Sequence, residues 1–325
     1  MTDFLFSPEH IGVFSPPISS TNQQLVDQLG FKKEFLTDKL GFTGCRHVRA
    51  DNPVTFLAKA AVANLKLKDT EFDASKIECL VFVTQNPDQN LPATANILQA
   101  ELGLPKSALC FDINQGCSGF VIGLNVINSI MSLNKMENGL LITADAYSKV
   151  LRRDDRNSFP LFSDGAAAVR VKRFAKQKIL SWDWGSDGEG ANHLTTKLSA
   201  HADHCISHDH AQLLTINGRE IYNFAVLHVP ESIDCCLKKA STSEDEVDLF
   251  AIHQANKFIV NAIRKKIGVS EERCPFLLSD SGNTIASTIP MFLNLANENV
   301  SLVGKKILIS GFGVGLSWAT ALIEF

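Results

Sequence analysis

The chain has 325 residues, 45% of them hydrophobic, which suffices for two compact domains or one large α/β unit. Its formal net charge of −4 argues against a protein that works chiefly by binding nucleic acid or anionic lipid. Because no stretch approaches about 20 uninterrupted apolar residues and the first residues do not resemble a signal peptide, we expect a cytoplasmic protein without membrane insertion.

The first hundred residues predict helices that alternate with a strand. Helices are expected near residues 21–29, 53–67 and 93–102, and the short apolar run 77–84 is typical of a buried strand. A proline-rich loop carrying Leu91 precedes the third helix. This alternation favours an α/β fold.

A cysteine lies where the next strand passes into a helix, in the stretch 111–120, Phe-Asp-Ile-Asn-Gln-Gly-Cys-Ser-Gly-Phe. Apolar residues at spacings of three and four predict the helix from about 118 to 132. Its N-terminus directs backbone N–H groups at Cys117, which favours the thiolate. Cys117 is therefore a candidate nucleophile, and the alternative is a buried structural cysteine. We expect most of the eight cysteines to be free core residues, because no C-x-x-C pair occurs.

The second half of the chain repeats the parts of the first. A strand is expected at 139–144 and a strand pair at 160–171, and strands separated by helices predict a largely parallel sheet. Residues 246–253 resemble the strand at 77–84, residues 304–311 resemble that at 139–144, and residues 318–325 resemble the strand that ends at Val171. The repetition predicts a pseudo-symmetric body with a cleft between its halves.

We place the boundary between these halves at 1–174 and 175–325. A turn-rich loop is expected at 182–190, and residues 201–210 follow with four histidines, two aspartates and one cysteine. Such side chains can bind zinc or nickel. Their spacing matches no common zinc module, so we expect a solvated, histidine-rich loop and no functional metal site.

Two further residues lie at strand ends of the second half. His253 ends the apolar strand 246–253, and Asn283 lies between a turn glycine and a predicted helix. Each has an ordinary structural interpretation, as a strand-end histidine and as a helix N-cap. A second glycine loop, 311–315, precedes the last strand. Because a nucleophilic cysteine needs partners for protons or developing charge, the combination predicts a thiol acyl-transfer site.

These motifs resemble one enzyme family. The segments 111–120, His-Gln-Ala-Asn at 253–256, Gly-Asn-Thr at 282–284 and 313–318 are similar to the β-ketoacyl-[acyl carrier protein] synthase III branch of the thiolase superfamily. The resemblance implies a duplicated five-layer αβαβα fold and a homodimer. It also implies that an acyl thioester is transferred to the cysteine and then condensed decarboxylatively with a malonyl thioester, in a fatty-acid-like or specialised pathway.

The resemblance implies roles for individual residues. His253 and Asn283 would stabilise the enolate formed as carbon dioxide leaves, and the backbone N–H groups of Cys117 and Gly315 would form the oxyanion hole. The resemblance implies no cofactor beyond the substrates. It implies acyl-coenzyme A or an acyl carrier protein as the partner that presents them. A basic cluster at 264–266 would receive an acidic carrier protein, or is simply a solvated helix face.

The positions that bind substrate in the family match this sequence less completely than the catalytic motifs do. Leu91 falls on the loop that, in the family, reaches the acyl pocket of the partner subunit. Phenylalanine replaces the family's adenine-stacking tryptophan, and lysine replaces a neighbouring arginine, which predicts altered coenzyme A binding and a specialised pathway. The expected coenzyme A and pantetheine contacts are Phe35, Lys39, Arg156, Ile216, Gly218, Ala255 and Asn256.

Two alternatives remain open at this point. The same cysteine, histidine and asparagine would serve an O- or N-acyltransferase of this fold. A non-catalytic scaffold or a metal-binding module that uses residues 201–210 is the more distant alternative.

Overall fold

A computed structural model describes residues 4–173, 177–196 and 213–325. Its first sheet has the strand order β1-β8-β7-β5-β6, and β2 pairs with another part of β8. Strand β5 is parallel to β6 and β7, whereas β8 is antiparallel to β7, β1 and β2. These strands are β1 (Phe4–Leu5), β2 (Ile11–Phe14), β5 (Cys79–Val83), β6 (Leu109–Ile113), β7 (Asn138–Asp145) and β8 (Gly165–Arg173).

The second sheet repeats the inner part of the first. Its order is β12-β13-β14-β9, with β12 parallel to β13 and the other pairs antiparallel. Strands β12, β13 and β14 thus take the places of β5, β7 and β8, which confirms the predicted strand correspondences. The bounds are β9 (Lys178–Ser186), β12 (Leu249–Ile252), β13 (Lys306–Gly313) and β14 (Ser317–Glu324).

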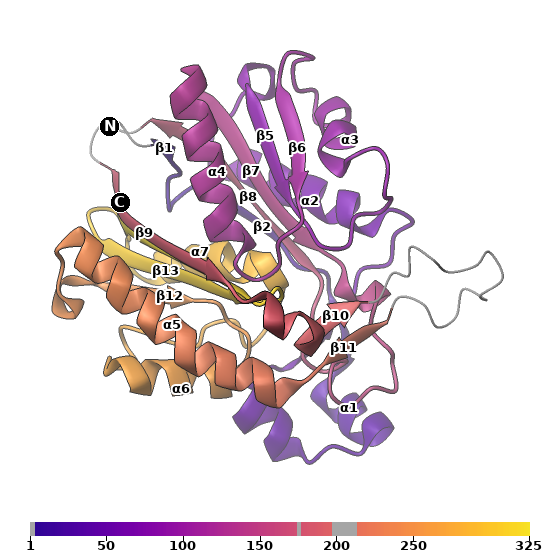
Figure 1. Ribbon diagram of the computed structural model, residues 1–325. Helices are drawn as coiled ribbons and strands as arrows, with labels where there is room; N and C mark the ends of the chain where they lie inside the picture. The colour runs from indigo at the N-terminus through magenta and orange to yellow at the C-terminus, as the bar shows by residue number, and fades with distance from the viewer. Residues whose placement is uncertain (1–3, 174–176, 197–212) are drawn as a thin grey trace.

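Helices cover both sheets and separate them. Helices α2 and α3 pack on the first sheet, α5 packs on the second with α6 beside it, and α4 and α7 contact strands of both (Figure 1). The result is a five-layer αβαβα sandwich. Within the described ranges, no helix is both long enough and apolar enough to cross a membrane. The helices are α1 (Asn22–Leu29), α2 (Pro53–Lys68), α3 (Thr94–Glu101), α4 (Gly119–Asn134), α5 (Gly218–Ala240), α6 (Lys257–Ile267) and α7 (Thr288–Asn299).

Smaller elements join these layers. Two short antiparallel pairs are formed by β3 with β4 and by β10 with β11. Their bounds, and those of the short π- and 3₁₀-helices, are β3 (Ile18–Thr21), β4 (Gly44–Arg46), β10 (Leu194–Thr196), β11 (Leu214–Ile216), η1 (Phe35–Leu40), η2 (Ala74–Lys76), η3 (Tyr147–Lys149), η4 (Gly188–His193), η5 (Glu244–Glu246) and η6 (Ile285–Ser287).

The prediction of a largely parallel sheet is wrong, because both sheets are mixed. Helical crossovers join β5, β6 and β7, which are parallel, but β13 enters β14 through a short turn. A short turn reverses the chain direction, so the strands that it joins must be antiparallel.

Two local predictions are also wrong. Residues 160–164 form no strand, because the backbone N–H groups of Ser163 and Asp164 donate to Asn283 and Arg46 in other segments. The expected loop at 182–190 begins inside β9. A Cβ at Gly185 would lie 2.1 Å from the Trp318 ring, so this glycine permits close packing within the sheet and marks no turn.

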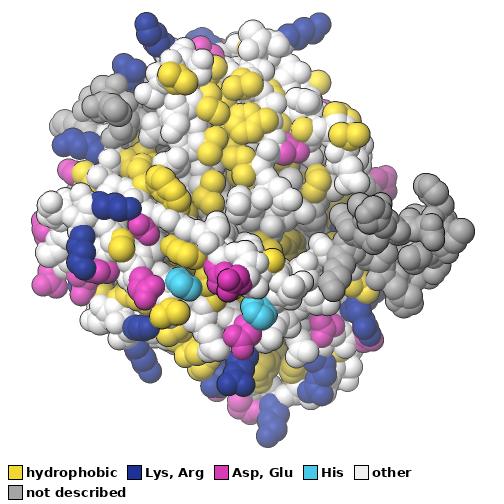
Figure 2. Space-filling view, viewed as in Figure 1, with side chains coloured by type: hydrophobic (Ala, Val, Ile, Leu, Met, Phe, Trp, Pro, Cys, Tyr) yellow, Lys and Arg dark blue, Asp and Glu magenta, His cyan; other side chains and the backbone are white. Residues whose placement is uncertain are grey.

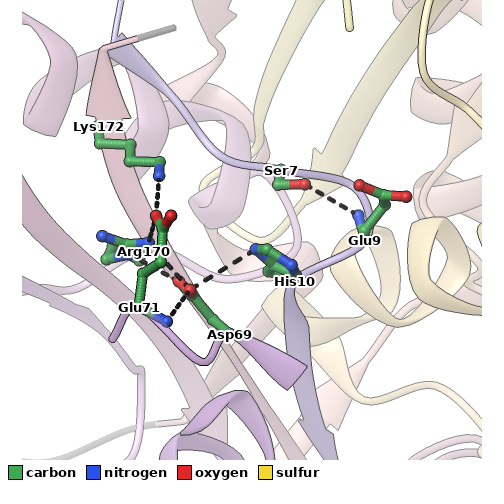
Figure 3. A network of polar contacts seen from close by, with 7 residues as sticks. All are labelled: Ser7, Glu9, His10, Asp69, Glu71, Arg170 and Lys172. Atoms are coloured by element: carbon green, nitrogen blue, oxygen red, sulfur yellow. Dashed lines mark hydrogen bonds and ion pairs between the residues drawn. The ribbon is translucent and has the colours of Figure 1, made fainter. Parts of the chain in front are cut away.

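A buried ion pair ties α2 to the first sheet. Nε and Nη2 of Arg170, on β8, lie 2.6 and 2.9 Å from the two carboxylate oxygens of Asp69, at the end of α2. These side chains are 8% and 2% exposed. Figure 3 shows Glu71 bridging Arg170 and Lys172 at the exposed rim of the network, with His10 on the other side of Asp69.

We expect Asp69→Ala to lower the free energy of unfolding by about 3 kcal/mol, because it leaves the buried Arg170 guanidinium with only the exposed Glu71 carboxylate as a partner. Urea unfolding followed by circular dichroism measures this loss. The exposed Lys238–Asp234 pair, 2.6 Å apart, supplies the control: Asp234→Ala should cost less than about 1 kcal/mol. Equal losses in the two variants would contradict the structural role assigned to the buried pair.

Candidate active site

The Cys117 thiol lies between the start of α4 and the end of β13. It precedes α4, whose buried face carries Phe120, Leu124, Ile127 and Met131 at the spacing that the sequence predicts. A Cβ at Gly313, the last residue of β13, would lie 3.0 Å from Cys117 Sγ. The glycine therefore leaves room beside the sulfur that any larger residue would fill.

The resting thiol differs from the sequence prediction. Cys117 is only 6% exposed, and burial raises its pKa, with a further rise from the Asp145 carboxyl and an opposing hydrogen bond from the backbone. The predicted shift toward thiolate is therefore wrong, because burial of the sulfur raises its pKa. Burial therefore favours the protonated thiol of Cys117.

His253 lies immediately after β12, next to the end of β13. Its backbone N–H donates to Ser310 O at 2.8 Å, and its ring meets the Phe312 ring edge-on at 5.3 Å. The imidazole Nδ1 lies 2.5 Å from the hydroxyl of Thr288. Burial lowers the pKa of His253 to about 3, so the ring is neutral at physiological pH.

Asn283 lies on the turn that leads into η6 and is 4% exposed. Its Nδ2 group donates to Ala255 O at 3.4 Å, two residues after His253, and its Oδ1 accepts from the N–H of Ile285 at 3.0 Å. Its side chain therefore does not cap α7, which begins at Thr288. The amide is held by backbone groups on both sides.

Shared neighbours bring Cys117, His253 and Asn283 to one region. Gly313 contacts the cysteine, and the adjacent Phe312 contacts the histidine. A Cβ at Gly119, in the first turn of α4, would lie 3.6 Å from Ala286 Cβ in η6, just after the asparagine. The ends of β12 and β13, the start of α4 and η6 thus converge.

Gly315 lies in the turn between β13 and β14, next to this junction. Its φ angle of 142° falls in the region that L-residues rarely adopt, so the backbone there requires glycine. Ser317, two residues later, lies 2.9 Å from the Ser118 hydroxyl, Oγ to Oγ, and this contact fastens the turn to the start of α4.

Several of the predicted substrate contacts line a surface cavity of about 540 Å³. Its lining includes Phe35, Arg156, Ile216 and Gly218. Ile216 ends β11, and Gly218 begins α5.

The three predicted coenzyme A contacts Phe35, Arg156 and Lys39 already have partners within the chain, and Lys39 is not among the residues that line this cavity. The Phe35 ring stacks on Phe31 with centroids 5.4 Å apart. The Arg156 guanidinium lies 5.0 Å from the Phe31 ring centroid and donates to Gly30 O at 3.0 Å. The Lys39 ammonium lies 4.4 Å from the Phe258 ring centroid.

The remaining predicted contacts, Ala255 and Asn256, follow His253. The Asn256 side chain caps α6, since its Oδ1 accepts from the N–H of Ile259 at 2.9 Å. Ala255 supplies the carbonyl that holds Asn283. Both residues have a clear structural task at these positions.

The histidine-rich stretch 201–210 lies outside the described residues. Within the described part of the chain, no group of three or more His, Cys, Asp or Glu side chains is arranged to hold a metal ion.

Sequence reasoning missed two buried residues of the site, Thr288 and Asp145. Asp145 ends β7 and accepts from the Gln85 N–H at 2.8 Å and the Thr84 hydroxyl at 3.3 Å. Burial raises its pKa to about 8, and these two donors act in the opposite direction. Its position, a polar residue at a strand end, is the signal that pointed to His253.

The raised pKa of Asp145 predicts pH-dependent stability. The folded state holds this proton more tightly than the unfolded chain, so the contribution to the free energy of unfolding is full at low pH and is lost as pH rises toward 8. Between pH 5 and 8, wild type should lose on the order of 1 kcal/mol per pH unit more than Asp145→Asn, which cannot ionise. Urea unfolding at several pH values measures the difference.

Ser287→Ala provides the control for that series. It removes a buried hydroxyl that bonds Thr143 and takes no titratable group away. Its stability curve should run parallel to that of wild type. Parallel curves for Asp145→Asn and wild type would show that Asp145 is already ionised in the folded protein.

Comparison with known proteins bears on this site. Residues 111–188 match the family model of 3-oxoacyl-[acyl-carrier-protein (ACP)] synthase III, and residues 237–325 match the model of its C-terminal part. The β-ketoacyl-[acyl-carrier-protein] synthase III of Streptococcus gordonii is 33% identical over 314 residues, 95% of this chain and 96% of that protein.

Solved structures agree with these matches. A crystal structure of a 3-oxoacyl-(acyl-carrier-protein) synthase III superposes with a TM-score of 0.91 at 32% identity, covering 99% of this chain and 100% of the other. The corresponding enzyme of Aquifex aeolicus gives a TM-score of 0.89 at 28% identity, with both chains fully covered. With its thiolase-like fold, the chain therefore belongs to the β-ketoacyl-[acyl-carrier-protein] synthase III family and is a condensing enzyme.

Proposed function

We propose that the reaction proceeds in two steps on Cys117. In the first, the sulfur attacks an acyl thioester, forms an acyl-cysteine thioester and releases the donor thiol, which takes the cysteine proton. In the second, a malonyl thioester loses carbon dioxide, and the resulting carbanion attacks the acyl group and expels the Cys117 thiolate. The products are a β-ketoacyl thioester and the thiolate, which takes a proton from solvent to regenerate the thiol. The observation that carries this proposal is the convergence of the thiol, His253 and Asn283 at one buried junction.

The second step requires hydrogen-bond donors for an enolate oxygen. A neutral imidazole can donate one N–H, and the Asn283 amide can donate another. The low pKa of His253 keeps the ring neutral, so it donates without bringing a full charge into the buried site. We assign the oxyanion of the first step to the backbone N–H groups of Cys117 and Gly315.

We propose that the acyl donors carry a pantetheine arm that enters through the 540 Å³ cavity. The relatives' name includes an acyl carrier protein, and we propose that acyl-coenzyme A or an acyl carrier protein presents the substrates here. No further cofactor takes part. Phe35, Lys39, Arg156, Ile216, Gly218, Ala255 and Asn256 are the proposed contacts around this entrance.

The experiment that tests the function combines a malonyl thioester with an acyl primer. Release of carbon dioxide and a β-ketoacyl product supports condensation. Transfer of the acyl group to an added hydroxyl or amine, with the malonyl thioester left intact, would favour an O- or N-acyltransferase instead. If no acyl thioester forms an adduct with the protein, the two-step route is excluded.

We further propose a homodimer formed through β6. This strand is at the edge of the first sheet among the described strands, so its outer hydrogen-bonding groups face no neighbouring strand of the sheet. Figure 2 shows hydrophobic side chains gathered over the half of the molecule that holds α4 and β6. Leu109 on β6 is 44% exposed and Leu133 on α4 is 83% exposed.

A second copy would pair with the β6 edge and cover this apolar surface. Sedimentation at micromolar protein should give a dimer, and Leu109→Lys should shift it toward monomer. A monomeric wild type would contradict the proposal.

We also propose a cytoplasmic location. The seven cysteines in the described part of the chain are free thiols, including the exposed Cys235. Free exposed thiols are typical of a reducing compartment.

A further inference from the structure

The Thr288 hydroxyl lies against the imidazole of His253. Thr288 is the first residue of α7 and is fully buried. Its Oγ1 atom lies 2.5 Å from His253 Nδ1, and no other described side chain forms a hydrogen bond with the ring. The hydroxyl is therefore the group that can decide which ring nitrogen carries the proton.

The same hydroxyl has a second acceptor within reach, the carbonyl of Ile285 at 3.2 Å. That carbonyl already accepts the backbone N–H of Thr288, so it does not depend on the hydroxyl proton. His253 Nδ1 is both closer and without another described partner. The hydroxyl has one proton, and its contact with the ring at 2.5 Å is shorter than its contact with the Ile285 carbonyl at 3.2 Å, so we take the ring nitrogen as the acceptor.

We propose that Thr288 donates its hydroxyl proton to His253 Nδ1 and thereby holds the ring in the tautomer with its own proton on Nε2. Thr288 is then a positioning residue, which acts on the substrate only through His253. The inference rests on the proposed function, because an Nε2–H group is useful where an enolate oxygen must be stabilised. The opposite tautomer would turn a nitrogen lone pair toward that oxygen.

One turn orients both proposed donors. The N–H of Ile285 holds Asn283 Oδ1 at 3.0 Å, which leaves the Asn283 amide nitrogen as the donor end. The carbonyl of Ile285 lies against Thr288, which holds the histidine. Ile285 itself has a φ angle of 55°, uncommon for a β-branched residue. The backbone between Asn283 and Thr288 thus fixes two side chains for the same step.

Nitrogen-15 NMR of histidine-labelled protein tests the tautomer directly. In wild type we expect the one-bond N–H coupling of His253 at Nε2, with Nδ1 unprotonated. Thr288→Val keeps the shape of the side chain and removes the hydroxyl, so the Nδ1-protonated tautomer should gain population. Thr288→Ser should retain the wild-type spectrum. A wild-type ring protonated at Nδ1 would overturn the proposal without any variant.

Separated half-reactions supply the second readout. Thr288→Val should lower the rate of malonyl decarboxylation about 10- to 100-fold, since one donor is misdirected, while Cys117 loading by an acyl thioester changes less than about threefold. Thr288→Ser should restore decarboxylation. Ser181→Ala, which removes a buried hydroxyl on β9 that donates to Cys236 O, is the control and should leave both rates near wild type.

The outcomes separate this inference from the proposed function. If Thr288→Val decarboxylates like wild type, or loses loading and decarboxylation equally, Thr288 does not position the histidine. Should Thr288→Val fail to fold, a Thr288→Ser spectrum with the proton on Nδ1 would overturn the inference equally. If wild type itself neither loads nor decarboxylates, the proposed function fails, whereas the wild-type NMR spectrum still decides the tautomer.

Discussion

Replacing Cys117 with alanine should abolish acyl-enzyme formation completely. The side chain is the proposed attacking group, and Ala offers no atom that can form a thioester. Intact-mass measurement after incubation with an acyl thioester should show one acyl adduct on wild type and none on Cys117→Ala. Turnover to a β-ketoacyl product should fall below detection.

Cys274→Ala is the matched control for this experiment. Cys274 is also a free, buried thiol, and burial raises its pKa to about 12. It lies in the segment between α6 and η6 and is not part of the glycine-rich turn at the start of α4, so this variant should acylate at the wild-type rate. If Cys117→Ala still formed an acyl adduct and the double variant Cys117→Ala/Cys274→Ala did not, the acyl group would be carried by Cys274 and not by Cys117.

The sequence predicted those parts of the fold that depend on local pattern. The spacing of Phe120, Leu124, Ile127 and Met131 predicted the buried face of α4. The apolar runs of the second half matched those of the first, and the strands equivalent to β5, β7 and β8 are β12, β13 and β14. Repeated local patterns fold into repeated local structures, so the sequence alone indicates the duplication.

The direction of the strands and the burial of individual side chains could not be predicted from the sequence in the same way. Whether Gly185 marks a turn or a close contact depends on Trp318, which lies more than a hundred residues away in the chain. The charge state of Cys117 depends on how completely the fold removes it from water, and this reverses the effect expected from the helix N-terminus. Such properties arise from tertiary packing, which a local pattern does not contain.

In the candidate site, too, some residues could be predicted from local sequence pattern and others only from tertiary contacts. A strand-to-helix junction rich in glycine indicates Cys117, a strand end indicates His253, and a turn glycine before a predicted helix indicates Asn283. The group that contacts the histidine, Thr288, lies 35 residues farther along the chain. In the sequence, Thr288 looks like an ordinary first residue of a helix, so its contact with the His253 ring can be found only from the three-dimensional structure.

Removing either proposed enolate donor should separate the two half-reactions. We expect His253→Ala and Asn283→Asp each to lower malonyl decarboxylation by about 10²- to 10³-fold, the usual loss when one donor to a developing oxyanion is removed. Asn283→Asp preserves the size of the side chain and the acceptor for Ile285 N–H. It removes the donor and adds a carboxylate where negative charge develops, so its effect does not depend on a cavity.

Loading of Cys117 should change less than about threefold in both variants, because this step uses the backbone oxyanion hole. Asn294→Ala, which removes another buried amide farther along α7, should leave both half-reactions near wild type. Stopped reactions analysed for acyl-enzyme mass and for released carbon dioxide distinguish the two steps. If loading fell as far as decarboxylation, His253 and Asn283 would have to act on the cysteine thiol and not on the enolate.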